Sequence, residues 1–183
     1  LTGRADTITA ESLLATQVSR WDKLKDMRGV CEAFRRVAER RGDFHGMVVG
    51  TVAQSANERA ELEACLRLVQ AADPSIADRL HVWSVPASGT RKHDDTISAV
   101  QSAADIIVQK SLHEGFGLTV SEAMLKAKPV IATAVGAIPT QIQHGRNGLL
   151  LADTSDPAEL ATTVFDLGSD PDGRARLGTV AQA

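Results

Sequence analysis

Short apolar runs of five to seven residues alternate along the chain with longer segments in which apolar residues recur every three or four positions. Continuous short runs are typical of strands buried on both faces, and the longer spacing is typical of helices with one apolar face. Strands are predicted at residues 13–19, 44–49, 80–85, 105–109, 129–133 and 149–153. This alternation predicts an α/β fold, a Rossmann-like doubly wound parallel sheet with helices on both faces.

Capping residues and prolines set the ends of the predicted helices. Asp26 caps a helix that ends at Gly42, and Asp156-Pro157 opens one that runs to about Leu167. Further helices are predicted at 57–72, from Asp94 or Asp95 through Ala103, at 119–127 and within 170–183, with one helical turn in 134–142. A polar loop, PASGTRKHDD, leads into the helix that ends at Ala103.

The first twelve residues are small and polar, and the chain does not open with Met. We therefore predict a linker at 1–12, the start of a fragment of a longer protein, and a single domain at 13–183.

Composition narrows the class of protein. Hydrophobic residues make up 43% and charged residues 23%, as in globular domains. Aromatic residues are only 3%, which argues against a stacking platform for single-stranded nucleic acid, and the net charge of −3 argues against a nucleic-acid or membrane surface. No apolar run is long enough to span a membrane, and no secretion signal is visible. Cys31 and Cys65 are predicted to be core thiols, which favours a reducing cytoplasm.

The chemistry is concentrated in KSLHEGFGLTVSEAMLKAKPVIAT, residues 110–133. Two carboxylates, Glu114 and Glu122, flank the turn Gly115-Phe116-Gly117 and the start of a helix. Free N–H groups and the positive end of the dipole at a helix start favour a phosphate. Because each carboxylate is within reach of hydroxyls beside that phosphate, the stretch predicts a sugar-nucleotide site.

EGFGLTVSEAM resembles the E-x7-E signature of retaining family 4 glycosyltransferases with the GT-B fold. The longer stretch QKSLHEGFGLTVSEAMLKAKPVIATAVGAIP is most similar to the trehalose synthases, which join an NDP-glucose to glucose, and to their trehalose phosphorylase relatives. The resemblance covers the chain from about Ala15. It implies the C-terminal, donor-binding half of such an enzyme. The implied partners are a nucleotide-sugar donor, a sugar acceptor and the missing N-terminal domain of the same chain.

The loop after the first strand supplies the charges that a diphosphate requires. Arg20 and Lys25 follow that strand, and ligands of such sheets bind beyond the carboxyl ends of the strands. A guanidinium fork and an ammonium suit a diphosphate, although basic loop residues are commonly only solvated.

The resemblance assigns a role to each of these positions. It gives Arg20 and Lys25 to the leaving diphosphate, Glu114 to the hydroxyls of the donor sugar, and Glu122 to those of the ribose. Arg20, Lys25 and Glu114 are thus the predicted catalytic residues. Backbone around the glycine turn completes the predicted binding set, which adds Gly115, Phe116, Gly117, Leu118, Thr119 and Glu122. The resemblance places the nucleotide base near Gly50 or against Val85-Pro86.

The resemblance implies no cofactor besides the NDP-glucose co-substrate and no metal, and the five histidines share no metal-ligand spacing. The sequence departs from the family at Gly136-Ala137, where Gly-Gly is usual, and at Thr140, where an acidic residue often follows the proline. It also departs at Lys126-Ala127-Lys128, which lacks the common Gly before the strand.

Three alternatives stay open. The first is a trehalose phosphorylase-like enzyme, and the second is a nucleotide-binding module that is inactive alone. The third is a retaining glycosidase that uses Glu114 and Glu122 as acid and nucleophile, which requires the two carboxyl groups roughly 5–5.5 Å apart.

Overall fold

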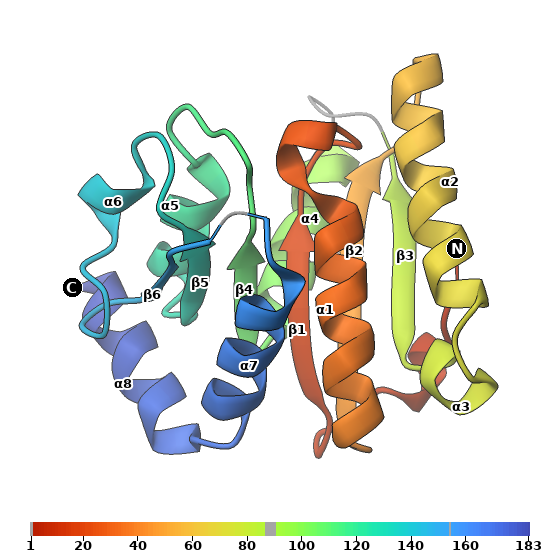
Figure 1. The fold of residues 1–183 in the computed structure, drawn as a ribbon. Coiled ribbons are helices and arrows are strands. Elements are labelled where there is room, and N and C mark those ends of the chain that lie inside the picture. Colours follow the sequence, from red (N-terminus) through yellow and green to blue (C-terminus); the bar gives the residue numbers. More distant parts are fainter. Residues whose placement is uncertain (1, 87–90, 154) are drawn as a thin grey trace.

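The computed structural model describes residues 2–86, 91–153 and 155–183 (Figure 1). Six strands form one sheet: β1 (Leu13–Val18), β2 (Phe44–Thr51), β3 (Leu80–Val85), β4 (Ile106–Gln109), β5 (Val130–Thr133) and β6 (Leu149–Leu151). Their order is β3-β2-β1-β4-β5-β6, and every neighbouring pair is parallel. This is the strand order of the Rossmann fold, so the predicted fold class is confirmed.

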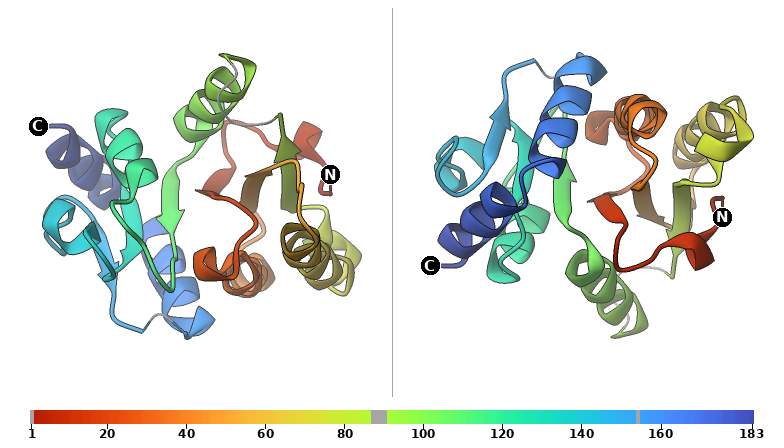
Figure 2. Two further views of the ribbon diagram at one scale, coloured as in Figure 1. Left: turned by 90° about the horizontal axis from the view of Figure 1, so that it is seen from above. Right: turned by 90° about the horizontal axis from the view of Figure 1, so that it is seen from below.

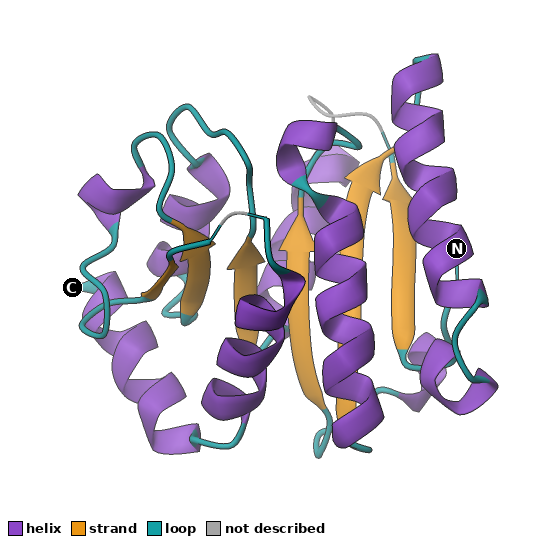
Figure 3. Ribbon diagram, in the orientation of Figure 1, coloured by secondary structure: helices purple, strands orange, loops and turns teal. Residues whose placement is uncertain are grey.

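Helices cover both faces of the sheet (Figures 2 and 3). They are α1 (Met27–Arg40), α2 (Ala56–Gln70), α3 (Pro74–Ala77), α4 (Arg91–Ala103), α5 (Leu118–Leu125), α6 (Ile138–Gln141), α7 (Pro157–Gly168) and α8 (Pro171–Gln182). One buried cluster joins α1, α2 and α7 to the sheet, and a second joins α4 and α5 to the opposite face. The site described below lies where the carboxyl ends of β1 and β4 meet.

Helix α1 shows how the sequence directs this packing. The Asp26 carboxylate accepts a hydrogen bond from the Gly29 N–H and so caps the helix. Val30, Phe34 and Val37 recur at helical spacing and are buried against the sheet. Gly46 in β2 leaves the room that the Phe34 ring occupies. A one-sided apolar face is therefore sufficient to attach α1 to the sheet.

Apart from shifts of one or two residues at helix ends, two features of the helices differ from the sequence predictions. Helix α4 begins at Arg91, so the predicted start at Asp94 or Asp95 is wrong. Asp94 lies within the first turn instead, where the positive end of the helix dipole stabilises its carboxylate. Helix α3 was not predicted: Asp73-Pro74 was interpreted only as the end of the preceding helix, but Asp73 also caps the short helix that begins at Pro74. Of the predicted polar loop, residues 87–90 lie outside the described residues, as do Leu1 and Thr154.

The predicted linker runs beside the edge strand β3. The Thr2 N–H donates to the Val82 carbonyl at 3.3 Å, and the Thr2 hydroxyl accepts from the Val82 N–H at 3.1 Å. Residues Ala5–Thr7 form a single 3₁₀ turn. The division of the chain at residue 13 stays a prediction. Cys31 and Cys65 are free and buried, as expected of core thiols.

Candidate functional site

Two loops leave the sheet side by side at the point where the strand order reverses, one after β1 and one after β4 (Figure 1). The buried side chain of Gln17 joins them, because its amide donates to the Lys25 carbonyl and accepts from the Lys110 N–H, each at 2.7 Å. A backbone hydrogen bond from Leu112 N–H to the Leu24 carbonyl, 2.8 Å long, adds a second link. The crevice between β1 and β4, where such sheets bind ligands, thus has fixed walls.

An ion pair closes the floor of this crevice. The Nζ atom of Lys25 lies 2.6 Å from Oε2 of Glu114, and the two side chains are only 15% and 11% exposed. The same carboxylate oxygen accepts hydrogen bonds from the Gln109 amide at 3.1 Å and the Ser111 hydroxyl at 3.2 Å. Burial alone would raise the pKa of Glu114, but the hydrogen bond and charge of Lys25, together with hydrogen bonds from the Ser111 hydroxyl and the Gly115 N–H, outweigh burial and lower the pKa. Glu114 is therefore held as a carboxylate.

A second lysine–carboxylate pair joins the same two loops. The side chain of Lys110 is fully buried and donates to the carboxylate of Asp26, the cap of α1. Asp26 adopts a left-handed backbone conformation with φ of 42°. The sequence marked Asp26 as a cap, but no spacing pattern connects it with Lys110, eighty-four residues away.

Arg20 and Lys25 line one cavity. This cavity of about 330 Å³ is bounded by Val18, Ser19, Arg20, Lys25, Gln109, Glu114, Phe116, Gly117, Leu118 and Thr119. The Arg20 side chain is 69% exposed and lies 3.7 Å from the Asp22 carboxylate, a weak surface contact that leaves the guanidinium able to turn inward. Of the predicted residues, only Gly115 and Glu122 do not line this cavity.

Helix α5 directs its N-terminus toward the cavity without a side-chain cap. Gly117 precedes it with φ of +86°, a conformation that glycine adopts without cost, and it offers no side-chain oxygen to the first N–H groups. Helices α1, α2 and α7 each have such a cap, from Asp26, Ser55 and Asp156. The first turn of α5 is thus suited to an external anion that lies beside Lys25.

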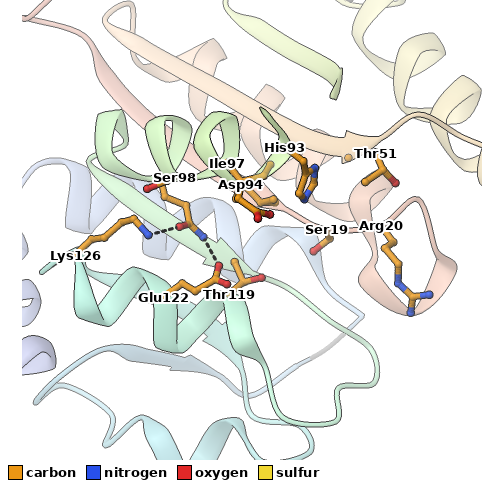
Figure 4. Close-up of a pocket in the computed structure, with 13 residues that line it drawn as sticks. Ser19, Arg20, Thr51, His93, Asp94, Ile97, Ser98, Thr119, Glu122 and Lys126 are labelled. Carbon is orange, nitrogen blue, oxygen red and sulfur yellow. Dashed lines mark hydrogen bonds between the residues drawn. The ribbon is translucent and has the colours of Figure 1, made fainter. Parts of the chain in front are cut away.

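The second predicted carboxylate belongs to a larger adjoining cavity of about 460 Å³ (Figure 4). Its lining consists of Val18, Ser19, Arg20, Gly50, Thr51, His93, Asp94, Ile97, Ser98, Gln101, Thr119, Glu122 and Lys126. The two cavities share Val18, Ser19, Arg20 and Thr119, so they form one trough along the sheet edge. Gly50, one of the expected neighbours of the base, lies in this larger part.

Helix α4 supplies the wall that sequence reasoning missed. His93, Asp94, Ser98 and Gln101 all face the larger cavity from α4, opposite Glu122 on α5. His93 and Asp94 belong to the stretch that the sequence predicted as a polar loop, and only the sheet order places this helix across from α5.

A glycine outside the predicted set holds the loop that carries Glu114. Gly136 has φ of +57°, and a Cβ there would overlap the Glu114 carbonyl. The Ala137 N–H also donates to the Gly115 carbonyl at 3.0 Å. Ala137 itself has φ of −85°, which any residue adopts, so the family's second glycine is not required at this turn.

No group of three or more His, Cys, Asp or Glu side chains arranged to hold a metal occurs in 2–86, 91–153 or 155–183. Across the same ranges, no helix combines the length and the apolar character that crossing a membrane requires.

Comparison with known proteins gives a consistent set of similarities. The model of the family "Glycosyl transferases group 1" matches residues 13–170. The trehalose synthase of Rubrobacter xylanophilus is 37% identical over 171 residues, which are 93% of this chain and 38% of that protein. The trehalose phosphorylase of Grifola frondosa is 36% identical over 107 residues, 58% of this chain and 14% of that protein.

Among solved structures, Anabaena Alr3699/HepE in complex with UDP-glucose is similar with a TM-score of 0.80 and 21% identity, over 94% of this chain and 43% of that one. At this identity the similarity is one of fold. The chain spans less than half the length of each of these relatives.

Proposed function

This chain belongs to the glycosyl transferases group 1 family, and from that premise we propose that it is the donor-binding domain of a retaining, trehalose-synthase-like glycosyltransferase. In this proposal the domain binds NDP-glucose, and glucose passes to a hydroxyl of an acceptor sugar. Groups that hold the acceptor would come from a second domain outside these 183 residues, since the relatives are more than twice as long. The 183 residues alone would bind nucleotide without efficient turnover.

One observation supports this proposal above the others: the trough has different chemistry at its two ends. One end has the Lys25–Glu114 pair and the uncapped start of α5, and the other end has Glu122. A nucleotide sugar has the matching order of groups, namely sugar, diphosphate and ribose. The assignment places Glu114 on the sugar hydroxyls and Glu122 on the ribose hydroxyls, with backbone of residues 115–119 along the diphosphate.

Transfer requires stabilisation of the departing diphosphate. As the bond from the anomeric carbon to the diphosphate oxygen breaks, negative charge grows on that oxygen. A new bond forms to the acceptor oxygen on the same face, and the proton of the acceptor hydroxyl passes to the departing diphosphate. Arg20, Lys25 and the first N–H groups of α5 would stabilise that charge, at roughly 2.7–4 kcal/mol for each contact that tightens in the transition state. Lys25 has three N–H donors, so its contact with Glu114 leaves donors for the phosphates.

The proposal involves no cofactor apart from the donor. We retain a reducing cytoplasm as the proposed compartment, supported by the two free, buried thiols of Cys31 and Cys65. The UDP-glucose complex of the Anabaena protein makes a uridine donor the first to test.

Calorimetric titration with UDP, ADP and GDP tests the proposal directly. We expect one of the three to bind, and both Arg20→Ala and Glu122→Ala to weaken it. Arg67→Ala is the matched control, because Arg67 is 68% exposed and lies 3.7 Å from Glu63, much as Arg20 lies from Asp22. Failure of all three nucleotides to bind the folded chain would reject the proposal.

The similarity to trehalose phosphorylase supports a second candidate, in which inorganic phosphate takes the place of the nucleotide. That enzyme would bind phosphate in the same calorimeter and ignore the three nucleoside diphosphates. The glycosidase alternative is less well supported, because Glu114 and Glu122 lie in different parts of the trough and have different partners.

A further inference from the structure

Glu122 is not alone in the wall of the larger cavity. The amide nitrogen of Gln101 in α4 donates to Oε2 of Glu122 at 3.1 Å, and the amide oxygen of Gln101 accepts from Nζ of Lys126 at 2.9 Å. Gln101 is completely buried, whereas Glu122 is exposed to the cavity. The dashed lines in Figure 4 follow this chain of contacts from Lys126 to Glu122. Two helices from distant parts of the sequence are thus joined through one amide.

The arrangement is unexpected for these residue positions. Glu122 and Lys126 are four residues apart on α5 with the carboxylate first, the order that favours a direct ion pair on a helix surface. The ion pairs of the described residues do not include this pair, although they include the equivalent one between Arg36 and Glu32 on α1. Gln101 lies between the two charges, so neither is in contact with the other.

The polarity of the Gln101 amide is determined by its neighbours. A lysine ammonium only donates hydrogen bonds, so the side of the amide that faces Lys126 must be the oxygen. The nitrogen must then face Glu122, which as a carboxylate only accepts. An amide rotated by half a turn would place donor against donor and acceptor against acceptor. Lys126 therefore determines which end of Gln101 meets Glu122.

This geometry leaves one carboxylate oxygen of Glu122 for a ligand. Oε2 is directed to Gln101, and Oε1 accepts no hydrogen bond from the part of the chain that the structure describes. If Gln101 were apolar, Lys126 would be free to contact Glu122 directly, and an ammonium with three donors would compete with ligand hydroxyls for both oxygens. The amide orients the carboxylate and keeps the lysine away from it.

We propose that Gln101 and Lys126 are positioning residues that hold Glu122 to receive the ribose hydroxyls of the nucleotide. This inference rests on the proposed function, because the ribose assignment of Glu122 belongs to it. Neither residue touches the reacting atoms. Their effect on binding passes entirely through the contact between Glu122 and the 2′- and 3′-hydroxyls.

The test compares each nucleotide with its 2′,3′-dideoxy counterpart. The 183-residue chain is titrated with UDP, ADP and GDP, and the one that binds is then paired with its dideoxy form. We expect Gln101→Leu to weaken the ribonucleotide roughly tenfold, the loss expected for one hydrogen bond with a charged partner, and to leave the dideoxynucleotide nearly unchanged. Lys126→Met should shift the ratio of the two affinities in the same direction. Lys128→Met, two residues along, should not shift it.

A role in folding alone would give a different pattern. If Gln101→Leu weakens both nucleotides equally, or if Lys126→Met leaves the ratio unchanged, the inference is rejected. Because Gln101 is buried, its variant is first checked by thermal unfolding, and Lys126→Met supplies the test if Gln101→Leu does not fold. In a Glu122→Ala background, Gln101→Leu should cause no further loss, as expected for two residues that act through one contact.

Failure here is distinguishable from failure of the proposed function. If no nucleotide binds the parent chain, the proposed function fails, and the inference fails with it. If a nucleotide binds and requires Arg20, yet the parent chain does not discriminate the dideoxy form, the inference is overturned together with the ribose role of Glu122, while nucleotide binding by the domain stands.

Discussion

Lys25 and Glu114 are eighty-nine residues apart in the sequence, and their side chains meet at 2.6 Å. The contact joins the loop after β1 to the loop after β4 on the floor of the crevice. In the proposed function one partner binds the diphosphate and the other binds the sugar. The ion pair therefore joins the residue that is proposed to bind the diphosphate to the residue that is proposed to bind the sugar, and the reaction breaks the bond between the diphosphate and the sugar.

Removal of Lys25 is expected to change the titration of Glu114 and the stability of the chain. In Lys25→Met the burial of Glu114 remains but the main partner that lowers its pKa is lost, so the pKa of Glu114 rises. The folded chain should be less stable than the parent at neutral pH. Carbon-13 NMR of the glutamate carboxyls reports the pKa, and urea unfolding reports the stability.

The pH dependence of that difference follows from the direction of the shift. Because the pKa of Glu114 in the folded chain lies below its ordinary value of 4.5, the stabilisation is present above pH 4.5 and is lost as the pH falls through the folded pKa. The difference in unfolding free energy between the parent chain and Lys25→Met should therefore become smaller in acid. Lys23→Met, at an exposed lysine of the same turn, is the control. An equal difference in unfolding free energy at pH 3 and pH 7 would contradict the role of Lys25 in stabilising the Glu114 carboxylate.

Gly136 is expected to tolerate no side chain. Gly136→Ala combines the cost of a left-handed backbone with a clash against the Glu114 carbonyl. Gly145→Ala is its matched control, since Gly145 has φ of +76° but open space around it. We expect about 1 kcal/mol of lost stability for Gly145→Ala, the backbone cost alone, and clearly more for Gly136→Ala. Thermal unfolding of both variants measures the difference, and equal losses would show that the close approach is unimportant.

The fold was predictable because its signals are local. Apolar strand runs such as 44–49 and capping residues such as Asp26 and Asp156 act within a few positions, and the structure confirms the elements that they predict. The start of α4 was wrong because an acidic residue in a first turn and one at a cap produce similar sequence patterns.

The candidate site was predictable only where a motif marks it. The glycine turn and the pairs Arg20 with Lys25 and Glu114 with Glu122 have recognisable spacings. The contacts of Lys110 with Asp26, and of Gln101 with Glu122, join residues that only the sheet order brings together. No periodicity in a single sequence encodes such pairs. The roles of the predicted residues stay predictions until binding is measured.

Ala127 occupies a position that favours glycine. Its φ is +54°, and the Lys128 N–H donates to the Ala123 carbonyl while the Ala127 N–H donates to Met124, the pattern of a Schellman motif after α5. Ala127→Gly should stabilise the chain by about 0.5–1 kcal/mol, because the relief of left-handed strain exceeds the added entropy of the unfolded chain. Ala71→Gly, at the end of α2 with φ of −81°, relieves no strain and should destabilise. Urea unfolding of the two variants checks the opposite signs.

The paired histidines at the far end of the sheet are expected to weaken the fold in mild acid. Nδ1 of His45 lies 3.1 Å from Nε2 of His81, and the rings are stacked with their centroids 5.4 Å apart. Burial, followed by the charge of His45, lowers the pKa of His81 from 6.5 to about 4, and burial also lowers the pKa of His45.

Below pH 6.5 the unfolded chain binds protons that the folded chain does not, so stability falls from pH 6.5 toward pH 4. For one proton the slope approaches about 1.4 kcal/mol per pH unit. His81→Gln removes one of the two groups, and its unfolding free energy should therefore depend less steeply on pH across this window. His113→Gln, at an exposed histidine, should keep the slope of the parent chain. Parallel slopes for the parent and His81→Gln in urea unfolding would mean that the buried pair does not control acid stability.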